Sequence, residues 1–186
     1  VTAENVIREF ARNALVKEQD TYRINKLYAL AAADADHKAT HIVTAALSKT
    51  NAIATVTSLL QTVRDDAEEM DGYVALISHK HKSAFLEAAT GTYHSISFGN
   101  AVSINGVTYE NVMMLDDLPC IFVPQSRMQT AITVQSGDSN NGGIVAGAST
   151  KDISCLITHC ETPLAVSKLD AIKQFGPQEN QLFDGT

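Results

Sequence analysis

The sequence predicts an α+β fold, in which amphipathic helices are packed in layers with short strands. Three observations favour this class. Apolar residues recur every three to four positions over residues 53–70, which is typical of a helix with one buried face. Two apolar runs, residues 112–115 and 120–123, are short and bounded by turn residues, as strands usually are. Asn105-Gly106 separates two further apolar pairs and predicts a tight hairpin, because both residues tolerate positive φ.

Two helices followed by a break are predicted in the N-terminal part of the chain. Thr2 is placed to cap the first helix and Asp20 to cap the second, while residues 34–41 interrupt the helical pattern. The first apolar stripe consists of Val6, Ile7, Phe10 and Ala14, and the second of Ile24, Leu27, Tyr28 and Ala31.

The third helix is predicted over residues 53–70, with Thr50 or Ser48 as its cap. Its C-terminal turns carry four carboxylates, which the helix dipole disfavours by roughly 0.3–1 kcal/mol each. Two interpretations follow: the helix end is solvated, or a basic surface of a partner faces it. The four acidic residues are Asp65, Asp66, Glu68 and Glu69.

The segment after residue 71 predicts alternating strands, turns and one more helix. Asp71-Gly72 turns the chain into a strand at residues 73–77, and Ser78 caps a helix that points Ala84, Phe85, Leu86 and Ala89 inward. Residues 116–119 form a turn between two strands, and Pro124 ends the second of them. Residues 136–150 are rich in Gly, Ser and Asn and predict a mobile loop before a strand at residues 153–158. A short helix is expected within residues 164–175.

The amino-acid composition is typical of a globular protein. The 186 residues include 45% hydrophobic residues and carry a formal charge of −7, so no basic surface for tight nucleic-acid binding is expected. Three cysteines lie in or beside apolar runs and indicate core positions in a reducing compartment. No membrane span is expected, and the Val at position 1 suggests a processed or truncated product. Residues 1–71 and 72–186 are expected to be two parts of one continuous unit.

No group of residues matches a known type of active site. His37 and His41 are spaced as metal ligands on a helix but lie in a predicted break, and residues 79–82 read as a solvated helix start. Cys155 and His159 are some 13 Å apart at about 3.3 Å per strand residue, and adjacent His159 and Cys160 point to opposite faces. The sequence therefore predicts no catalytic residue, no cofactor-binding residue and no metal ligand. Two alternatives stay open: a small cytosolic α/β enzyme that uses Cys160 or His159, and a monomeric binding module with a pocket under residues 136–150.

Five stretches, in the same order, resemble the major capsid proteins of tailed bacteriophages and prophages with the HK97-type fold. Residues 115–128 read Leu-Asp-Asp-Leu-Pro-Cys-Ile-Phe-Val-Pro-Gln-Ser-Arg-Met and are similar to a family segment with the pattern Asp-Gly-Leu-Pro followed by Val-Pro and Arg. Residues 73–86 resemble the family's strand and helix around a Ser-Pro pair, with Ser-His here. The other stretches are residues 3–10 with 20–24, residues 50–70, which resemble the long spine helix, and residues 157–177.

The resemblance implies that residues 1–71 hold the spine helix and part of the peripheral domain, and that residues 72–186 form an axial-domain-like α/β region. It further implies a structural, non-enzymatic subunit that assembles with itself into pentamers and hexamers of an icosahedral shell enclosing DNA. Scaffold, portal and prohead protease are implied partners, and the implied location is the virion, with the bacterial cytoplasm before assembly. The N-terminal arm and E-loop typical of the family are not evident ahead of residue 1. Candidate subunit contacts are Asp65, Asp66, Glu68, Glu69, Arg127, Asn140 and Asn141.

Overall fold

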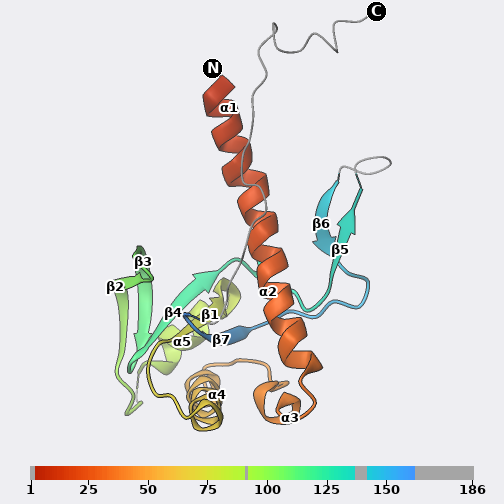
Figure 1. Cartoon of the computed structure of the whole chain (residues 1–186). Helices are drawn as coiled ribbons and strands as arrows, with labels where there is room; N and C mark the ends of the chain where they lie inside the picture. Colours follow the sequence, from red (N-terminus) through yellow and green to blue (C-terminus); the bar gives the residue numbers. More distant parts are fainter. Residues whose placement is uncertain (1–2, 91, 137–141, 162–186) are drawn as a thin grey trace, which may run out of the picture.

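A five-stranded mixed sheet with helices on both faces forms the body of the protein, and one long helix projects from it (Figure 1). The computed structural model describes residues 3–90, 92–136 and 142–161. The helices are α1 (Ala3–Phe10), a π-helical turn (Ala11–Leu15), α2 (Val16–Ala33), α3 (Lys38–His41), α4 (Ala52–Ala67) and α5 (Lys82–Ala88). Single 3-10 turns span His79–His81 and Gln125–Arg127. The predicted α+β class is thus confirmed.

The sheet has the strand order β2-β3-β4-β1-β7, in which β1 is parallel to β4 and antiparallel to β7. A separate hairpin, β5–β6, lies beside the long helix (Figure 1). The strands are β1 (Tyr73–Ser78), β2 (Ile96–Ile104), β3 (Val107–Leu115), β4 (Leu118–Val123), β5 (Ile132–Gln135), β6 (Gly143–Ala146) and β7 (Cys155–His159).

The N-terminal part forms one continuous helix, so the predicted division into two helices is wrong. α1 passes through the π-helical turn directly into α2, and Asp20 lies inside α2 instead of capping it. The reason is visible in the sequence, because residues 11–20 contain neither Gly nor Pro and nothing forces the backbone out of the helix. The Asp20 carboxylate instead accepts a hydrogen bond from Arg127 at 2.8 Å.

Both ends of α4 differ from the prediction. The helix begins at Ala52, where neither Ser48 nor Thr50 acts as its cap; Asn51 precedes it and accepts a hydrogen bond from the Ser48 N–H at 2.7 Å. It ends at Ala67, because Glu68 adopts a left-handed conformation with φ of 54°. Met70 therefore lies outside the helix, and 64% of it is exposed.

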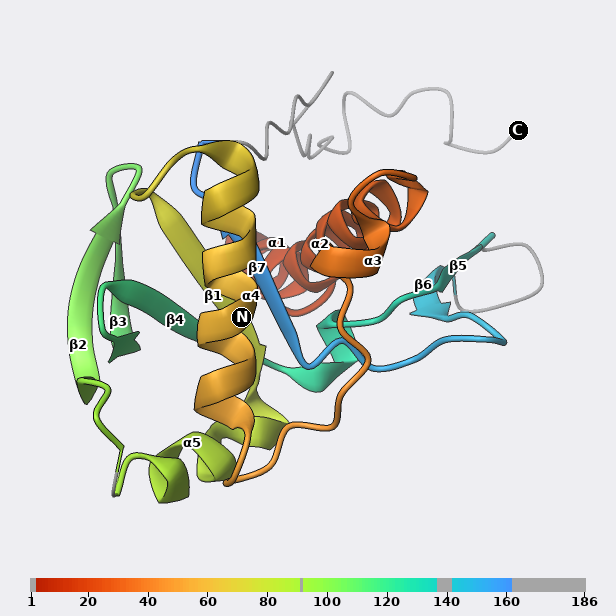
Figure 2. The ribbon, with the colours of Figure 1, turned by 90° about the horizontal axis from the view of Figure 1, so that it is seen from below.

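Each face of the sheet has its own hydrophobic core. The larger core joins α4 and α5 to the sheet and includes Val56, Phe85 and Ile77. The smaller core joins α2 to the opposite face and contains Ile24, Met128 and Ile153. Figure 2 shows α4 lying across the strands, with the long helix to one side. Phe85 is fully buried as predicted, but Leu86 is 46% exposed, because the single short helix α5 turns only one face to the sheet.

The predicted turns are correct in position and differ in extent. Asn105 and Gly106 have φ of 49° and 79° and form the predicted hairpin turn. The β3–β4 turn comprises only Asp116 and Asp117, because Leu118 already pairs with Leu115. Pro119 thus belongs to β4, near its start, where a missing N–H is tolerated. Pro124 ends β4 as predicted.

The expected loop at residues 136–150 is wrong in part, because β6 lies within it and pairs with β5. Glycine content indicated a loop, but Ile144-Val145 is suited to a strand. The helix expected within residues 164–175 lies outside the described residues, as do residues 137–141. Among the helices that the structure describes, none has the length and apolar character needed to cross a bilayer.

The long helix is held to the body where Gln125–Arg127 follows β4. Met128 is fully buried under α2, beside Ile24. The buried Asn25 amide donates a hydrogen bond to the Gln129 carbonyl at 3.2 Å, and Arg127 binds Asp20. Apolar packing, one buried hydrogen bond and one ion pair therefore fix the position of α2.

We expect Met128→Ala to lower the free energy of unfolding by about 2–5 kcal/mol, because truncation of a fully buried side chain leaves a cavity. Met70→Ala is the matched control and should change it by less than about 0.5 kcal/mol, since Met70 is 64% exposed. Urea denaturation followed by circular dichroism measures both. Equal effects of the two substitutions would contradict this description of the smaller core.

Candidate functional site

The acidic C-terminal end of α4 finds basic partners within the same chain. The Asp66 carboxylate lies 2.6 Å from His41 Nε2, and Glu69 lies 3.5 Å from His159 Nε2. Asp65 and Glu68 are exposed and form no ion pair with any residue that the structure describes. Two of the four carboxylates thus help to fix neighbouring elements, and two remain on the surface as candidates for a contact with another molecule.

Arg64 joins the same helix end to the β3–β4 turn. Its guanidinium donates to the Asp117 carboxylate and lies 5.9 Å from the centre of the Tyr73 ring. Burial, aided by the negative charge of Glu69, raises the pKa of Tyr73. The Arg64 side chain is only 12% exposed, so this cation is part of the protein interior.

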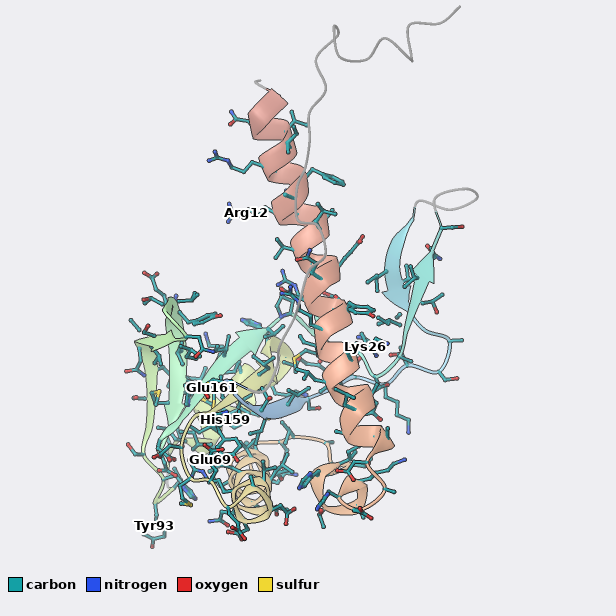
Figure 3. The ribbon with its side chains drawn as sticks, viewed as in Figure 1. Arg12, Lys26, Glu69, Tyr93, His159 and Glu161 are labelled. Carbon is teal, nitrogen blue, oxygen red and sulfur yellow. The ribbon has the colours of Figure 1, made fainter. Side chains whose placement is uncertain are left out.

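His159 is oriented through both of its ring nitrogens. Nδ1 accepts a hydrogen bond from the Glu161 N–H at 3.3 Å, so the remaining ring proton lies on Nε2, which faces Glu69. The ring also meets Tyr73 edge-on at 5.5 Å between centroids. Figure 3 shows Glu69, His159 and Glu161 on one side of the sheet, where β7 ends.

Two of the three cysteines, Cys120 and Cys155, are unsuited to act as nucleophiles. Burial raises the pKa of Cys155 to about 12 and also raises the pKa of Cys120. Such thiols stay protonated at neutral pH and are poor nucleophiles. The Cys160 N–H donates to the Gly72 carbonyl at 2.8 Å, which continues the β1–β7 pairing. Within the described chain no thiol is hydrogen-bonded to an imidazole.

His37 and His41 do come together, but with carboxylates. Their rings stack at 5.2 Å, and Asp34 Oδ2 lies 3.0 Å from His37 Nδ1. The hydrogen bond with Asp34 and its negative charge raise the pKa of His37, and the same hydrogen bond lowers the pKa of Asp34. The part of the chain with described side chains contains no group of three or more residues suited to hold a metal.

The remaining candidate contacts are placed as follows. Arg127 is 24% exposed in its side chain, and its guanidinium is engaged with Asp20 at 2.8 Å. Asn140 and Asn141 lie outside the described residues. Arg127 thus holds α2 to the body, a role that sequence reasoning missed because its partner is 107 positions away.

A groove of about 550 Å³ runs beside β7 and was not expected from the sequence. Its walls are α2, α4, residues 42–47 and residues 151–158, and most of the wall is apolar. None of residues 136–150, under which a pocket was expected, contributes to it. Only tertiary structure could reveal this groove, because segments far apart in the sequence form it.

Large apolar side chains are exposed on the elements that project from the body. Val6 and Phe10, which belong to the apolar stripe predicted for the first helix, are 55% and 58% exposed. Figure 1 shows their helix extending well beyond the sheet. Tyr93 points away from the body in Figure 3. Others on the long helix and the two hairpins are Val16, Tyr22, Leu30, Val107, Tyr109, Val134 and Val145.

No protein-family model, curated protein or solved structure matches the chain. The most distinctive surfaces of the described residues are the projecting, apolar elements and the groove beside β7.

We expect Asp34→Asn to lower the pKa of His37 towards about 6.5, the ordinary value, because it removes the hydrogen bond and charge that raise it. Asp36→Asn is the control and should lower it less, since Asp36 acts only through a weaker charge interaction. NMR titration of the histidine ring protons measures both. An unchanged His37 in Asp34→Asn would contradict the pairing.

The shifted pKa values of His37 and Asp34 make the stability of the fold depend on pH. The raised pKa of His37 stabilises the fold below about pH 6.5, and this contribution is lost as the pH rises through the folded-state pKa. The lowered pKa of Asp34 stabilises the fold above about pH 3.9, and this contribution is lost as the pH falls. The contact is therefore strongest between these two values.

Gly72→Ala should destabilise the protein more than Gly99→Ala. Both glycines have positive φ, 81° and 77°, so both substitutions carry a backbone cost of about 1–2 kcal/mol. At Gly72 the new Cβ would also meet His159 Nε2 at 2.2 Å, whereas at Gly99 no atom lies within 4 Å. Denaturant unfolding of the two variants separates the costs. Equal destabilisation would show that His159 does not occupy this position.

Proposed function

We propose that this chain is a structural subunit of an icosahedral capsid shell of the tailed-phage or prophage type. The observation that carries the proposal is the apolar surface exposed on projecting elements, above all Val6 and Phe10 on the long helix. Large exposed apolar surfaces mark sites of protein–protein contact. A shell subunit requires several such surfaces, because each copy contacts several neighbours.

The order of the five capsid-like stretches supports the same proposal. Residues 115–128, the most detailed of them, run from the end of β3 through β4 to the turn at Gln125–Arg127. This segment connects the sheet to Met128, which packs against α2. Its residues must therefore fit both the sheet and the contact with the long helix. The five stretches together extend over most of the chain.

The assignment of the spine helix changes within this proposal. Residues 50–70 resembled it in sequence, but α4 is a 16-residue helix packed across the sheet. The longest described helix runs over residues 3–33 and projects from the body. We therefore assign the spine to residues 3–33, the axial-domain-like part to the sheet with α4 and α5, and the peripheral part to the long helix with β5–β6.

The charges fit a shell that encloses DNA without reading its sequence. The formal charge is −7, and basic side chains such as Arg64 and Arg127 are engaged with carboxylates. Sequence-specific DNA binding uses clustered free cations, which this arrangement does not favour. The proposed location is the virion, with the bacterial cytoplasm before assembly.

Electron microscopy with light scattering on the product of the intact gene tests the proposal. We expect shells, rings or tubes whose formation depends on protein concentration. Phe10→Asp should reduce the scattering of assemblies at least tenfold, because a charge is placed on an exposed apolar contact. Gln61→Asp adds the same charge to an exposed position of α4 and should leave assembly intact. A compact monomer at every concentration and salt would refute the shell function.

A further inference from the structure

We propose that the open edge of β7 pairs with β5 of a second copy of this chain, so that the sheet continues from one subunit into the next. The contact deepens the proposed shell function and rests on it for its biological role.

β7 is the last strand of the sheet, with β1 on one side only. The Ser78 N–H donates to Ser154 and the Cys160 N–H donates to Gly72, which fixes the alternation of an antiparallel pair. The backbone groups of Cys155, Ile157 and His159 consequently face away from β1. No other described segment forms a backbone–backbone hydrogen bond with these three residues.

This edge lacks the features that usually prevent strand pairing. β7 reads Cys-Leu-Ile-Thr-His, without Lys, Pro, Asp or Glu, and its register with β1 runs without a shift. The opposite edge strand, β2, has register shifts on both sides of Asn100, which disturb an edge. Natural proteins protect sheet edges with charges, prolines and bulges. β2 is protected in this way and β7 is not.

The groove gives the edge of β7 a shape that suits an extended strand. Its apolar walls include Leu27 and Tyr28 of α2 and Leu59 and Val63 of α4. Its charged lining residues, Lys151 and Asp152, adjoin β7 on the N-terminal side. An uncharged strand can therefore form hydrogen bonds with β7 while its side chains contact both walls.

β5 of another copy has the matching properties. It reads Ile-Thr-Val-Gln without a charge, and Val134 is 69% exposed. The Gly147 N–H donates to Ala131, so the backbone groups of Ile132 and Val134 point away from β6. A two-stranded hairpin is by itself only marginally stable in water, so further pairing would stabilise it.

Geometry favours a second copy over the same chain. The Glu18 carboxylate of α2 lies against Gly143 at the start of β6, which leaves β5 as the outer strand of the hairpin. The hairpin extends away from its own β7 (Figure 1). A contact between two different surfaces is head-to-tail, and repeated contacts of this kind form rings where the rotation between copies closes and open filaments where it does not. Rings of subunits are what the proposed shell requires.

Residue-resolved hydrogen exchange on the complete protein tests the contact directly. As assembly proceeds with rising concentration, the amides of Cys155 and Ile157 should exchange at least tenfold more slowly. The amides of Ile132 and Val134 should slow in parallel. Leu156 and Thr158 are bonded to β1 and serve as internal controls, because they should exchange slowly at every concentration. Protection of the β7 amides without protection of β5 would assign the groove to another strand and overturn the proposal.

A proline pair provides the matched variants. Val134→Pro removes an outward N–H of β5 and should raise the concentration needed for association at least tenfold. Ala146→Pro removes an outward N–H of β6, where no pairing is proposed, and should leave association unchanged. Shells that form normally from Val134→Pro would overturn the strand contact while the shell function stands. A wild-type monomer at all concentrations would overturn both.

Discussion

The pairing of β1 with its two neighbours is the interaction on which the rest of the structure depends. β1 is parallel to β4 and antiparallel to β7, and five of its six residues are buried. Ile77 faces the core beneath α4 and α5, whereas Leu76 faces the core beneath α2. The two helical layers are therefore held on opposite sides of one strand, which also joins β7 to the rest of the sheet.

The long helix depends on β1 indirectly, through β4, which pairs with β1. Its support begins where β4 ends, because Pro124 stops the strand and the turn that follows presents Met128 to α2. The Asn25 hydrogen bond and the Asp20–Arg127 ion pair fix the orientation of α2 at this apolar contact. Only a short length of the helix is fixed in this way. Val6 and Phe10, near the other end of the helix, are more than half exposed.

Local signals made part of this fold predictable from the sequence. The strand at β1, the Asn105-Gly106 hairpin and the end of β4 at Pro124 follow from nearest-neighbour chemistry, and these predictions were confirmed. The partners of charged residues were not predictable, because His41–Asp66 and Arg127–Asp20 join distant segments. For this reason the sequence predicts Asp20 as a helix cap, although it lies inside α2. An aspartate suited to a cap is equally suited to a long-range ion pair.

The candidate site was less predictable than the fold. The acidic residues at and just beyond the end of α4 are visible in the sequence, but their partners are not. The groove beside β7 and the exposure of Val6 and Phe10 depend on where elements lie in space. An apolar stripe at helical spacing looks the same whether it is covered by its own chain or by another molecule.

The π-helical turn at Ala11–Leu15 determines where the N-terminal stripe points. Val6 and Ile24 are 18 positions apart, which is five full turns of a regular α-helix with 3.6 residues per turn. Without the π turn, Val6 would lie directly above the face that holds α2 to the body. The wider turn takes up one extra residue and so rotates the N-terminal face by about 100°. Insertion or deletion of one residue in this turn would therefore rotate the face that carries Val6 by about 100° relative to the body, and the body itself would not change.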